Sequence, residues 1–439
     1  MAIRCLSTLW HLINIINFKL YLGKEMKIKY RFYTILTCLA FMSQTSVVTA
    51  NNFGGPNAVK NTIDDDAGVE NAAIEKNFTE AWSDWKAGLQ KDHGFSIGID
   101  YSAVTLSSTE EGASGDDNAA SGMFRLYGSW DLVGRGTKNT GALVYKLEQR
   151  HSYTDVTVQD FGFDQGYVGL IEPPFSDQKG RWTNLYWRQR MNEGESTILA
   201  GFIDVTDYVN VYALASPWTG FMNFAFSTGS ASMFTPNDAT FGIAGGTMLG
   251  KNMFLIGSVA NAYADSTDPF DGAGDFFSEN EYFSSLELGW TRSQDRIYLD
   301  NMHVTLWHVD ESLLAGTPGG WGVAFNYSRA FKDNQYMPFI RGGYADEAGT
   351  LLETSLSVGL GYNAVGGRDQ LGLAFNWGKP NENSFGPGLN DQYVLEAYYR
   401  YQLSKEIALT PDLQFMKDPA LNPTEDSLWV LGLRLRVAL

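Results

Sequence analysis

The segment that decides the fold lies at the end of the chain, where residues 427–437 read SLWVLGLRLRV. From Trp429 onward every second residue is large and apolar, and the positions between include Arg434 and Arg436. Successive side chains of a β-strand point to opposite faces of the sheet. The segment therefore predicts a strand with one apolar face and one face that carries charge.

The same period of two recurs along most of the chain. In residues 143–150, for example, Leu143, Tyr145 and Leu147 occupy one face, and Lys146, Glu148 and Arg150 occupy the other. Segments with this pattern lie at 95–104, 124–132, 143–150, 182–191, 196–204, 239–248, 252–263, 282–291, 301–309, 320–331, 335–345, 352–363, 369–378, 393–403, 406–416 and 429–437. We expect about 16 to 18 antiparallel strands, near the ~9–11 residues that a tilted membrane strand needs. An even number would close the sheet.

Composition excludes several other classes of protein. The chain has 439 residues, of which 44% are hydrophobic and 19% charged, and a formal net charge of −18. Its 27 Phe, 22 Tyr, 12 Trp and 46 Gly suit many short strands with tight turns. An acidic chain of this kind is neither disordered nor a polybasic nucleic-acid binder, so no nucleic acid is expected as a partner. No apolar run reaches the ~18 residues of a membrane helix.

The N-terminal part reads as an export signal followed by a leader. Residues 26–31 are basic, residues 32–42 are apolar, and residues 48–50 are small, which together predict a signal peptide over 26–50. Residues 1–25 would then be an upstream extension, with translation starting at Met26. Because Cys5 and Cys38 both lie before residue 51, the exported chain would have no cysteine and no disulfide.

Two short regions precede the strands. Residues 51–77 are acidic and polar without a sustained apolar period, so we expect a solvated leader. Phe78, Trp82, Trp85 and Leu89 fall on one stripe, which predicts a short amphipathic helix over 78–91. That helix could pack on the body of the protein or lie across a barrel mouth. Residues 92–439 would form the all-β domain.

The alternation alone permits a soluble sandwich as well as a membrane barrel. Aromatic residues near strand ends and charged or small residues on the opposite faces favour a transmembrane antiparallel β-barrel with a wet interior. A barrel of about 16 strands is wide enough for an aqueous channel. Export then places it in the bacterial outer membrane.

Stretches without the period supply the connections. Residues 109–119 and 264–281 read as long acidic extracellular loops, whereas 365–368 and 404–405 read as tight periplasmic turns. A calcium site at Asp265, Asp268 and Asp271 has only weak support, because their spacing is not that of an EF-hand.

The C-terminal sequence resembles a known family. Residues 393–403 (YVLEAYYRYQL), 409–414 (LTPDLQ) and 426–436 (DSLWVLGLRLR) are similar to the end of the carbohydrate-selective porins of the OprB family. Weaker similarity extends through residues 185–189 and 199–204 and the predicted helix, so that most of residues 78–439 is covered. Departures from the family are the final Leu439, where many such barrels end in an aromatic residue, and acidic insertions near residues 110 and 270.

The resemblance implies a 16-stranded outer-membrane barrel that passes monosaccharides, above all glucose, by facilitated diffusion. Implied partners are small neutral sugars, outer-membrane lipid and lipopolysaccharide, and the barrel assembly machinery. It would work as a monomer or a homotrimer and need no cofactor.

Charged side chains on the inward faces are the candidates for solute contact, since guanidinium and carboxylate groups can replace the water around sugar hydroxyls. They are Arg125, Lys146, Glu148, Arg150, Arg188, Arg190, Glu396, Arg400, Arg434 and Arg436. Each could equally be solvated or paired with a neighbouring strand. Arg125 and Arg150 could face Arg434 and Arg436 in one basic patch once the barrel closes.

Other functions have less support in the sequence. Residues 245–252 imitate a P-loop, but Asn252 replaces the magnesium-binding hydroxyl and no helix pattern follows. Residues 359–364 imitate a dinucleotide fingerprint at a strand end. The chain also lacks a nucleophile elbow and a His-Glu-x-x-His motif. We therefore expect no enzyme, although a channel for other solutes, a lipase-type barrel or an adhesin stay open as alternatives.

Overall fold

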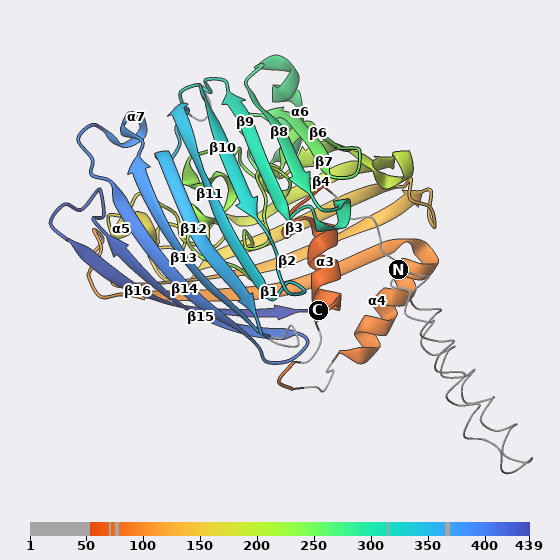
Figure 1. Ribbon diagram of the computed structural model, residues 1–439, viewed down its shortest axis with the longest axis horizontal. Helices are drawn as coiled ribbons and strands as arrows, with labels where there is room; N and C mark the ends of the chain where they lie inside the picture. Colours follow the sequence, from red (N-terminus) through yellow and green to blue (C-terminus); the bar gives the residue numbers. More distant parts are fainter. Residues whose placement is uncertain (1–52, 70–71, 75–78, 314–315, 365–368) are drawn as a thin grey trace, which may run out of the picture. The chain divides into compact units, whose positions relative to one another are not determined.

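The computed structural model describes residues 53–69, 72–74, 79–313, 316–364 and 369–439. The predicted signal peptide, the upstream extension and the turn at 365–368 lie outside these residues. Sixteen strands form one closed antiparallel barrel in which each strand pairs with its neighbours in sequence and β1 pairs with β16 (Figure 1). The predicted all-β, closed barrel is confirmed, with a strand count at the lower end of the expected range.

The strands are β1 Phe95–Ser108, β2 Asn118–Val133, β3 Gly141–Ser152, β4 Lys179–Met191, β5 Ser196–Ile203, β6 Thr240–Leu249, β7 Met253–Asn261, β8 Tyr282–Thr291, β9 Asn301–Val309, β10 Gly320–Ser328, β11 Tyr336–Glu347, β12 Leu352–Asn363, β13 Gln370–Pro380, β14 Gln392–Gln402, β15 Ile407–Lys417 and β16 Ser427–Ala438. The helices are α3 Val59–Ala67, α4 Glu80–His93, α5 Phe161–Asp164, α6 Pro269–Ser278 and α7 Glu382–Phe385, with 3-10 turns η1 Asn192–Gly194, η2 Val205–Asp207, η3 Phe224–Phe226, η4 Thr228–Ala231 and η5 Gln294–Arg296.

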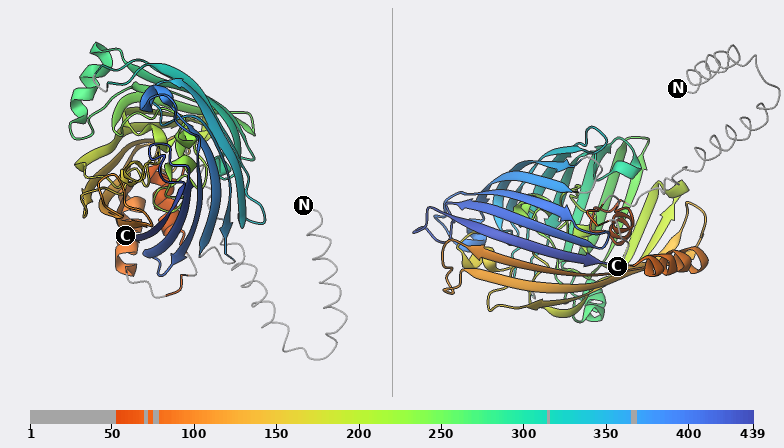
Figure 2. Two further views of the ribbon diagram at one scale, coloured as in Figure 1. Left: turned by 90° about the vertical axis from the view of Figure 1, so that its left-hand side faces the viewer. Right: turned by 90° about the horizontal axis from the view of Figure 1, so that it is seen from below.

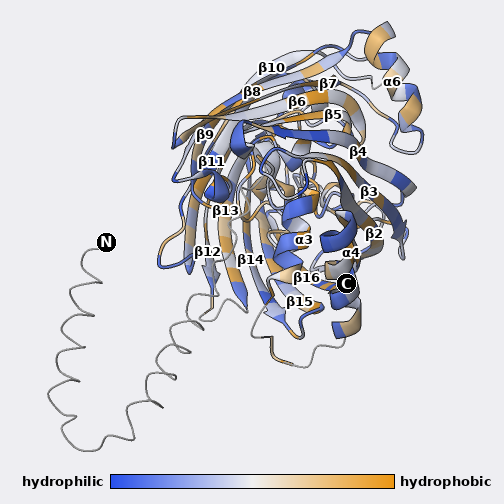
Figure 3. Cartoon of the chain, turned by 90° about the vertical axis from the view of Figure 1, so that its right-hand side faces the viewer, coloured by the Kyte–Doolittle hydropathy of each residue, from blue (hydrophilic) through white to orange (hydrophobic). Residues whose placement is uncertain are grey.

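The two faces of each strand differ as the alternation requires (Figure 3). On β13, Leu371, Leu373 and Phe375 point outward and are 43%, 50% and 41% exposed, whereas Ala374 and Asn376, which alternate with them, are buried inside. Leucines and aromatic residues thus cover the outer wall, where they suit contact with lipid. No helix among the described residues is long and apolar enough to cross a bilayer.

The two rims of the barrel carry different connections. We call the end with the C-terminus and the start of β1 the near rim, and the opposite end the far rim (Figures 1 and 2). Connections at the near rim are short, such as residues 250–252 and 403–406, where a turn was predicted at 404–405. Connections at the far rim include the three longest, residues 153–178, 204–239 and 262–281. This asymmetry is typical of outer-membrane barrels.

Two segments differ from their predicted structure. Residues 53–69 fold and enter the barrel, with helix α3 over Val59–Ala67, where a solvated leader was expected. Helix α6 interrupts the loop predicted over 264–281 and packs on the outer wall, with Phe270 against Phe202. Within the described ranges, which include Asp265, Asp268 and Asp271, no group of three or more His, Cys, Asp or Glu side chains is arranged to hold a metal ion.

Helix α4 lies outside the barrel at the near rim. The Trp130 indole donates a hydrogen bond to the carbonyl of His93 over 3.3 Å, and Arg135 donates to that of Asp92 over 3.1 Å. None of its residues is buried, and Trp85 is 48% exposed. The predicted helix could pack on the body of the protein or lie across a barrel mouth. Helix α4 packs on the body, and a different helix, α3, lies inside the barrel.

Candidate functional site

Three segments fill much of the barrel interior. They are residues 53–69, which we call the strap, residues 153–178, the β3–β4 loop, and residues 204–239, the inward loop (Figure 2). Large apolar side chains of the two loops form a buried cluster inside the ring of strands. Its fully buried members include Phe161 and Phe175 of the β3–β4 loop and Tyr212 and Phe226 of the inward loop. The channel is therefore defined by these segments as well as by the strands.

Inner-face side chains of β14 and β16 hold the inward loop on one side. The carboxylate of Glu396 accepts hydrogen bonds from the backbone N–H groups of Met222 and Asn223, over 2.6 and 3.0 Å. Arg434 donates to the carbonyls of Pro217 and Gly220 over 2.8 and 2.9 Å. It also pairs with Glu172 of the β3–β4 loop. Charged groups of the wall thus satisfy backbone groups that would otherwise lack partners in a buried loop.

Strands on the other side of the barrel hold the same loop. Asn210 donates its backbone N–H to Glu287 of β8 over 2.9 Å, and its carbonyl accepts from Arg341 of β11 over 3.1 Å. Ser357 of β12 donates to the carbonyl of Ala225 over 2.9 Å. Anchors on both sides fix the path of the loop across the interior.

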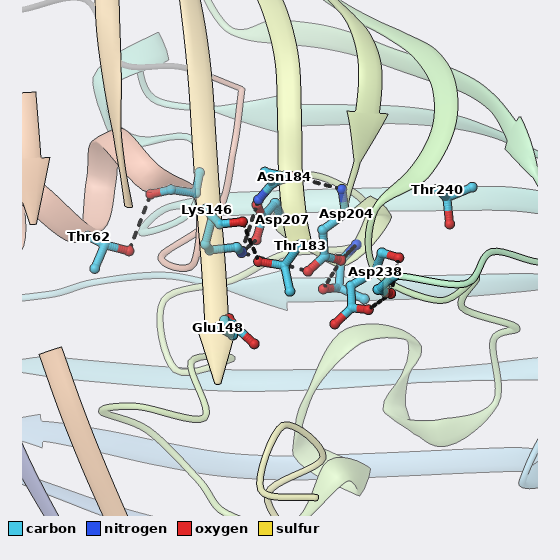
Figure 4. A network of polar contacts seen from close by, with 12 residues as sticks. Thr62, Lys146, Glu148, Thr183, Asn184, Asp204, Asp207, Asp238 and Thr240 are labelled. Atoms are coloured by element: carbon cyan, nitrogen blue, oxygen red, sulfur yellow. Dashed lines mark hydrogen bonds and ion pairs between the residues drawn. The ribbon is translucent and has the colours of Figure 1, made fainter. Parts of the chain in front are cut away.

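A polar network joins the start of the inward loop to β3 and β4 (Figure 4). The Lys146 ammonium lies 3.3 Å from Asp207 and 3.8 Å from Asp204, and the amide of Asn184 donates to Asp207 over 2.9 Å. Burial raises the pKa of Asp207 to about 7, an effect that Lys146 only partly offsets and that Asp204 reinforces. Two buried carboxylates therefore compete for one ammonium.

A second network joins β1, β2 and β16 to the strap. Asp100 accepts from Arg125 and, over 2.8 Å, from Arg436. Arg436 also pairs with Asp66 of α3 over 2.7 Å, and Tyr127 donates its hydroxyl to Asp66 over 2.9 Å. Closure of the barrel places β2 and β16 on the two sides of β1, so Arg125 and Arg436 share the carboxylate of Asp100.

The single basic patch predicted for the first and last strands is not formed. Arg434 turns to Glu172, and Arg150 pairs instead with Glu148 and with Asp238 of the inward loop, over 2.6 and 2.5 Å. Carboxylates accompany each guanidinium because unpaired charges are costly to bury.

All ten sequence-predicted residues lie on inward-facing strand positions. Arg400 is partly buried and the other nine are buried. Arg188 lies 3.5 Å from Asp131, and Arg400 donates to the carbonyl of Thr219 over 3.5 Å. The contacts that the structure shows for these groups are with protein atoms, and contact with solute stays a prediction.

An open space lies between the inward segments. A cavity of about 310 Å³ is bounded by the strap, both loops and the turn between β11 and β12. Its lining comprises Asn57, Leu170, Pro173, Pro174, Thr206, Ala215, Pro217, Phe221, Met222, Asn223, Phe224, Ser227, Ala231, Met233, Phe234, Thr235, Gly349, Thr350 and Leu351. Within the described part of the chain, no Asp, Glu, Lys or Arg lines it. It combines aromatic faces, prolines, hydroxyls and carboxamides.

Sequence reasoning missed this lining, although one signal was present. Residues 208–237 contain no Asp, Glu, Lys or Arg, in a chain of which 19% is charged. An uncharged, aromatic-rich stretch of that length is unusual for a loop exposed to water, and it marks a segment that folds into an interior.

Comparisons with known proteins agree with this architecture. The model of the carbohydrate-selective porin family, OprB, matches residues 291–439. The structure of Pseudomonas putida OprB at high pH is similar with a TM-score of 0.65 and 14% identity, covering 84% of this chain and 99% of that one. A mutant of Rh. blastica porin is similar with a TM-score of 0.50 and 11% identity, covering 79% and 100%. No curated protein matches the sequence. The chain therefore has the fold of a porin, and its C-terminal third matches the carbohydrate-selective porin family.

Proposed function

We propose that the chain is an outer-membrane channel through which small neutral carbohydrates, monosaccharides such as glucose, diffuse down their gradient. The observation that carries the proposal is the uncharged lining of the cavity inside a barrel whose outer wall is apolar. The match of residues 291–439 to carbohydrate-selective porins supports the solute class.

The lining fits the chemistry of a sugar. A monosaccharide is neutral, has apolar C–H faces and is surrounded by hydroxyls. Phe221, Phe224 and Phe234 provide apolar faces, and the hydroxyls of Thr206 and Thr235 provide hydrogen-bonding groups. A small number of such contacts replaces part of the hydration shell without holding the solute tightly, as diffusion through a channel requires.

The paired charges of the wall have a different role in this proposal. Arg434, Glu396 and Arg125 are at most 1% exposed and bonded to loops or neighbouring strands. They hold the inward segments in place, so that the opening has a fixed shape and a neutral surface. A charged solute entering the cavity loses hydration without gaining a counter-charge, which is unfavourable.

Swelling of liposomes that contain the purified protein tests the solute class. We expect glucose to enter about ten times faster than gluconate or protonated glucosamine. A difference of about 1.4 kcal/mol in free energy between the neutral and the charged solute gives this ratio. Liposomes without protein are the control. Equal rates for the neutral and charged solutes would instead favour a general channel, and a barrel without conductance in a planar bilayer would favour a sealed adhesin or an enzyme.

A further inference from the structure

The strap crosses the interior of the barrel. At one end the ring of Phe53 lies so close to Gly246 of β6 that a Cβ at that glycine would come within 2.5 Å of it. At the other end Asp66 is bonded to Arg436 of β16 and Tyr127 of β2. Because β6 and β16 lie far apart around the closed ring, residues 53–66 span the space between them.

Hydrogen bonds fix the part of the strap that precedes α3. Gly55 donates its backbone N–H to the carbonyl of Asp207 over 2.7 Å, which joins the strap to the inward loop. The carboxamide of Asn61 donates to the carbonyls of Gly54 and Gly55 over 3.0 and 2.8 Å. Thr62 donates to the carbonyl of Pro56 over 3.2 Å. The turn that contains Asn57 is therefore held on both sides.

Asn57 is the strap residue that lines the cavity. Its side-chain oxygen is buried and has no hydrogen-bond partner among the residues that the structure describes. A buried carboxamide oxygen without a partner is unfavourable by about 1–3 kcal/mol, so such groups in native proteins usually serve a purpose. Thr206 and Asn223 line the same cavity from the inward loop.

We propose that the strap is part of the solute site, and that the side-chain carboxamide of Asn57, which lines the cavity, forms a hydrogen bond with a hydroxyl of the passing sugar. This inference rests on the proposed function and assigns one of its solute contacts to a segment outside the barrel strands. The anchors at Asp66 and Gly55 set the position of this carboxamide.

Thiol modification tests the location of Asn57. The only cysteines of the sequence are Cys5 and Cys38, so the full chain carrying Cys5→Ser and Cys38→Ser provides a background without thiols. In that background we expect a methanethiosulfonate reagent to lower the single-channel conductance of Asn57→Cys, and glucose to slow the reaction. Ser278→Cys is the control, since Ser278 is exposed at the end of α6, which packs on the outer wall.

Sugar binding tests the hydrogen bond itself. We expect Asn57→Ala to raise the glucose concentration that half-blocks the ion current by about two- to tenfold, the effect of one lost hydrogen bond. An unchanged value, or a modified Asn57→Cys channel with unaltered conductance, would overturn the inference while the wild-type channel still passes glucose. If the wild-type protein itself fails to pass glucose, the proposed function falls as well.

Discussion

Replacing Glu396 should release the inward loop locally while the barrel stays folded. The Glu396 carboxylate on β14 accepts the backbone N–H groups of Met222 and Asn223 over 2.6 and 3.0 Å, in a place where none of the three residues is more than 1% exposed. Leucine has a similar volume and no acceptor. In Glu396→Leu both N–H groups therefore lose their partner without a large cavity being formed.

The expected magnitude follows from those two bonds. A buried donor left without an acceptor is unfavourable by about 1–3 kcal/mol, so the two together amount to about 4 kcal/mol. Local opening of the loop would then be favoured by about a thousandfold, since each 1.4 kcal/mol is a factor of ten. Arg434 still holds Gly220 before this position and Arg341 still holds Ser230 after it, so the effect should be confined to residues near 222.

Hydrogen–deuterium exchange measured by mass spectrometry is the appropriate assay. A peptide covering residues 219–226 should exchange far faster in Glu396→Leu than in the wild-type protein, and the open-channel current should become noisier because Met222 and Asn223 line the cavity. Glu353→Leu is the matched control. Glu353 pairs with Lys379 over 2.8 Å with side chains 30% and 41% exposed, a kind of pair that contributes about 0–1 kcal/mol. Exchange of the 219–226 peptide within about threefold of wild type in Glu396→Leu would refute the anchoring role.

Three further predictions concern the strap, the outer wall and pH. Asp66→Asn should weaken the bond to Arg436 and increase proteolysis of residues 53–69, while Asp64→Asn, on an exposed helix position, should not. Leu373→Lys should lower the free energy of unfolding in lipid vesicles by about 2–4 kcal/mol, because the side chain points outward and is 50% exposed; a value no larger than that for Leu373→Met would argue against lipid contact. Burial raises the pKa of Asp207 from 3.8 to about 7, so the folded state favours the neutral form of this side chain. Its contribution to the free energy of unfolding is therefore fully present below pH 3.8 and is lost as the pH rises toward 7. Exchange of the inward loop should therefore increase over that range, and Asp207→Asn should abolish that part of the change.

The alternation of side chains predicted the strands and their two faces, and the aromatic residues near strand ends together with the charged opposite faces favoured a barrel over a sandwich. Strand geometry has a period of two, so Leu373 and Ala374 must face opposite sides wherever the strand lies. For the same reason the sequence alone identified the inward positions of Arg125, Glu396 and Arg434. These are local properties of the backbone, and they do not depend on which strands become neighbours.

The sequence determined the strands, their two faces and the closure of the sheet, whereas only the tertiary structure decided what fills the barrel. One partner of Glu396 lies 174 residues away along the chain, one partner of Arg434 lies 262 residues away, and one partner of Asp66 lies 370 residues away. No periodic pattern encodes such contacts, because loops have no repeating geometry and their positions depend on the wall that surrounds them. The neutral cavity and the strap therefore became visible only once the sheet had closed around them.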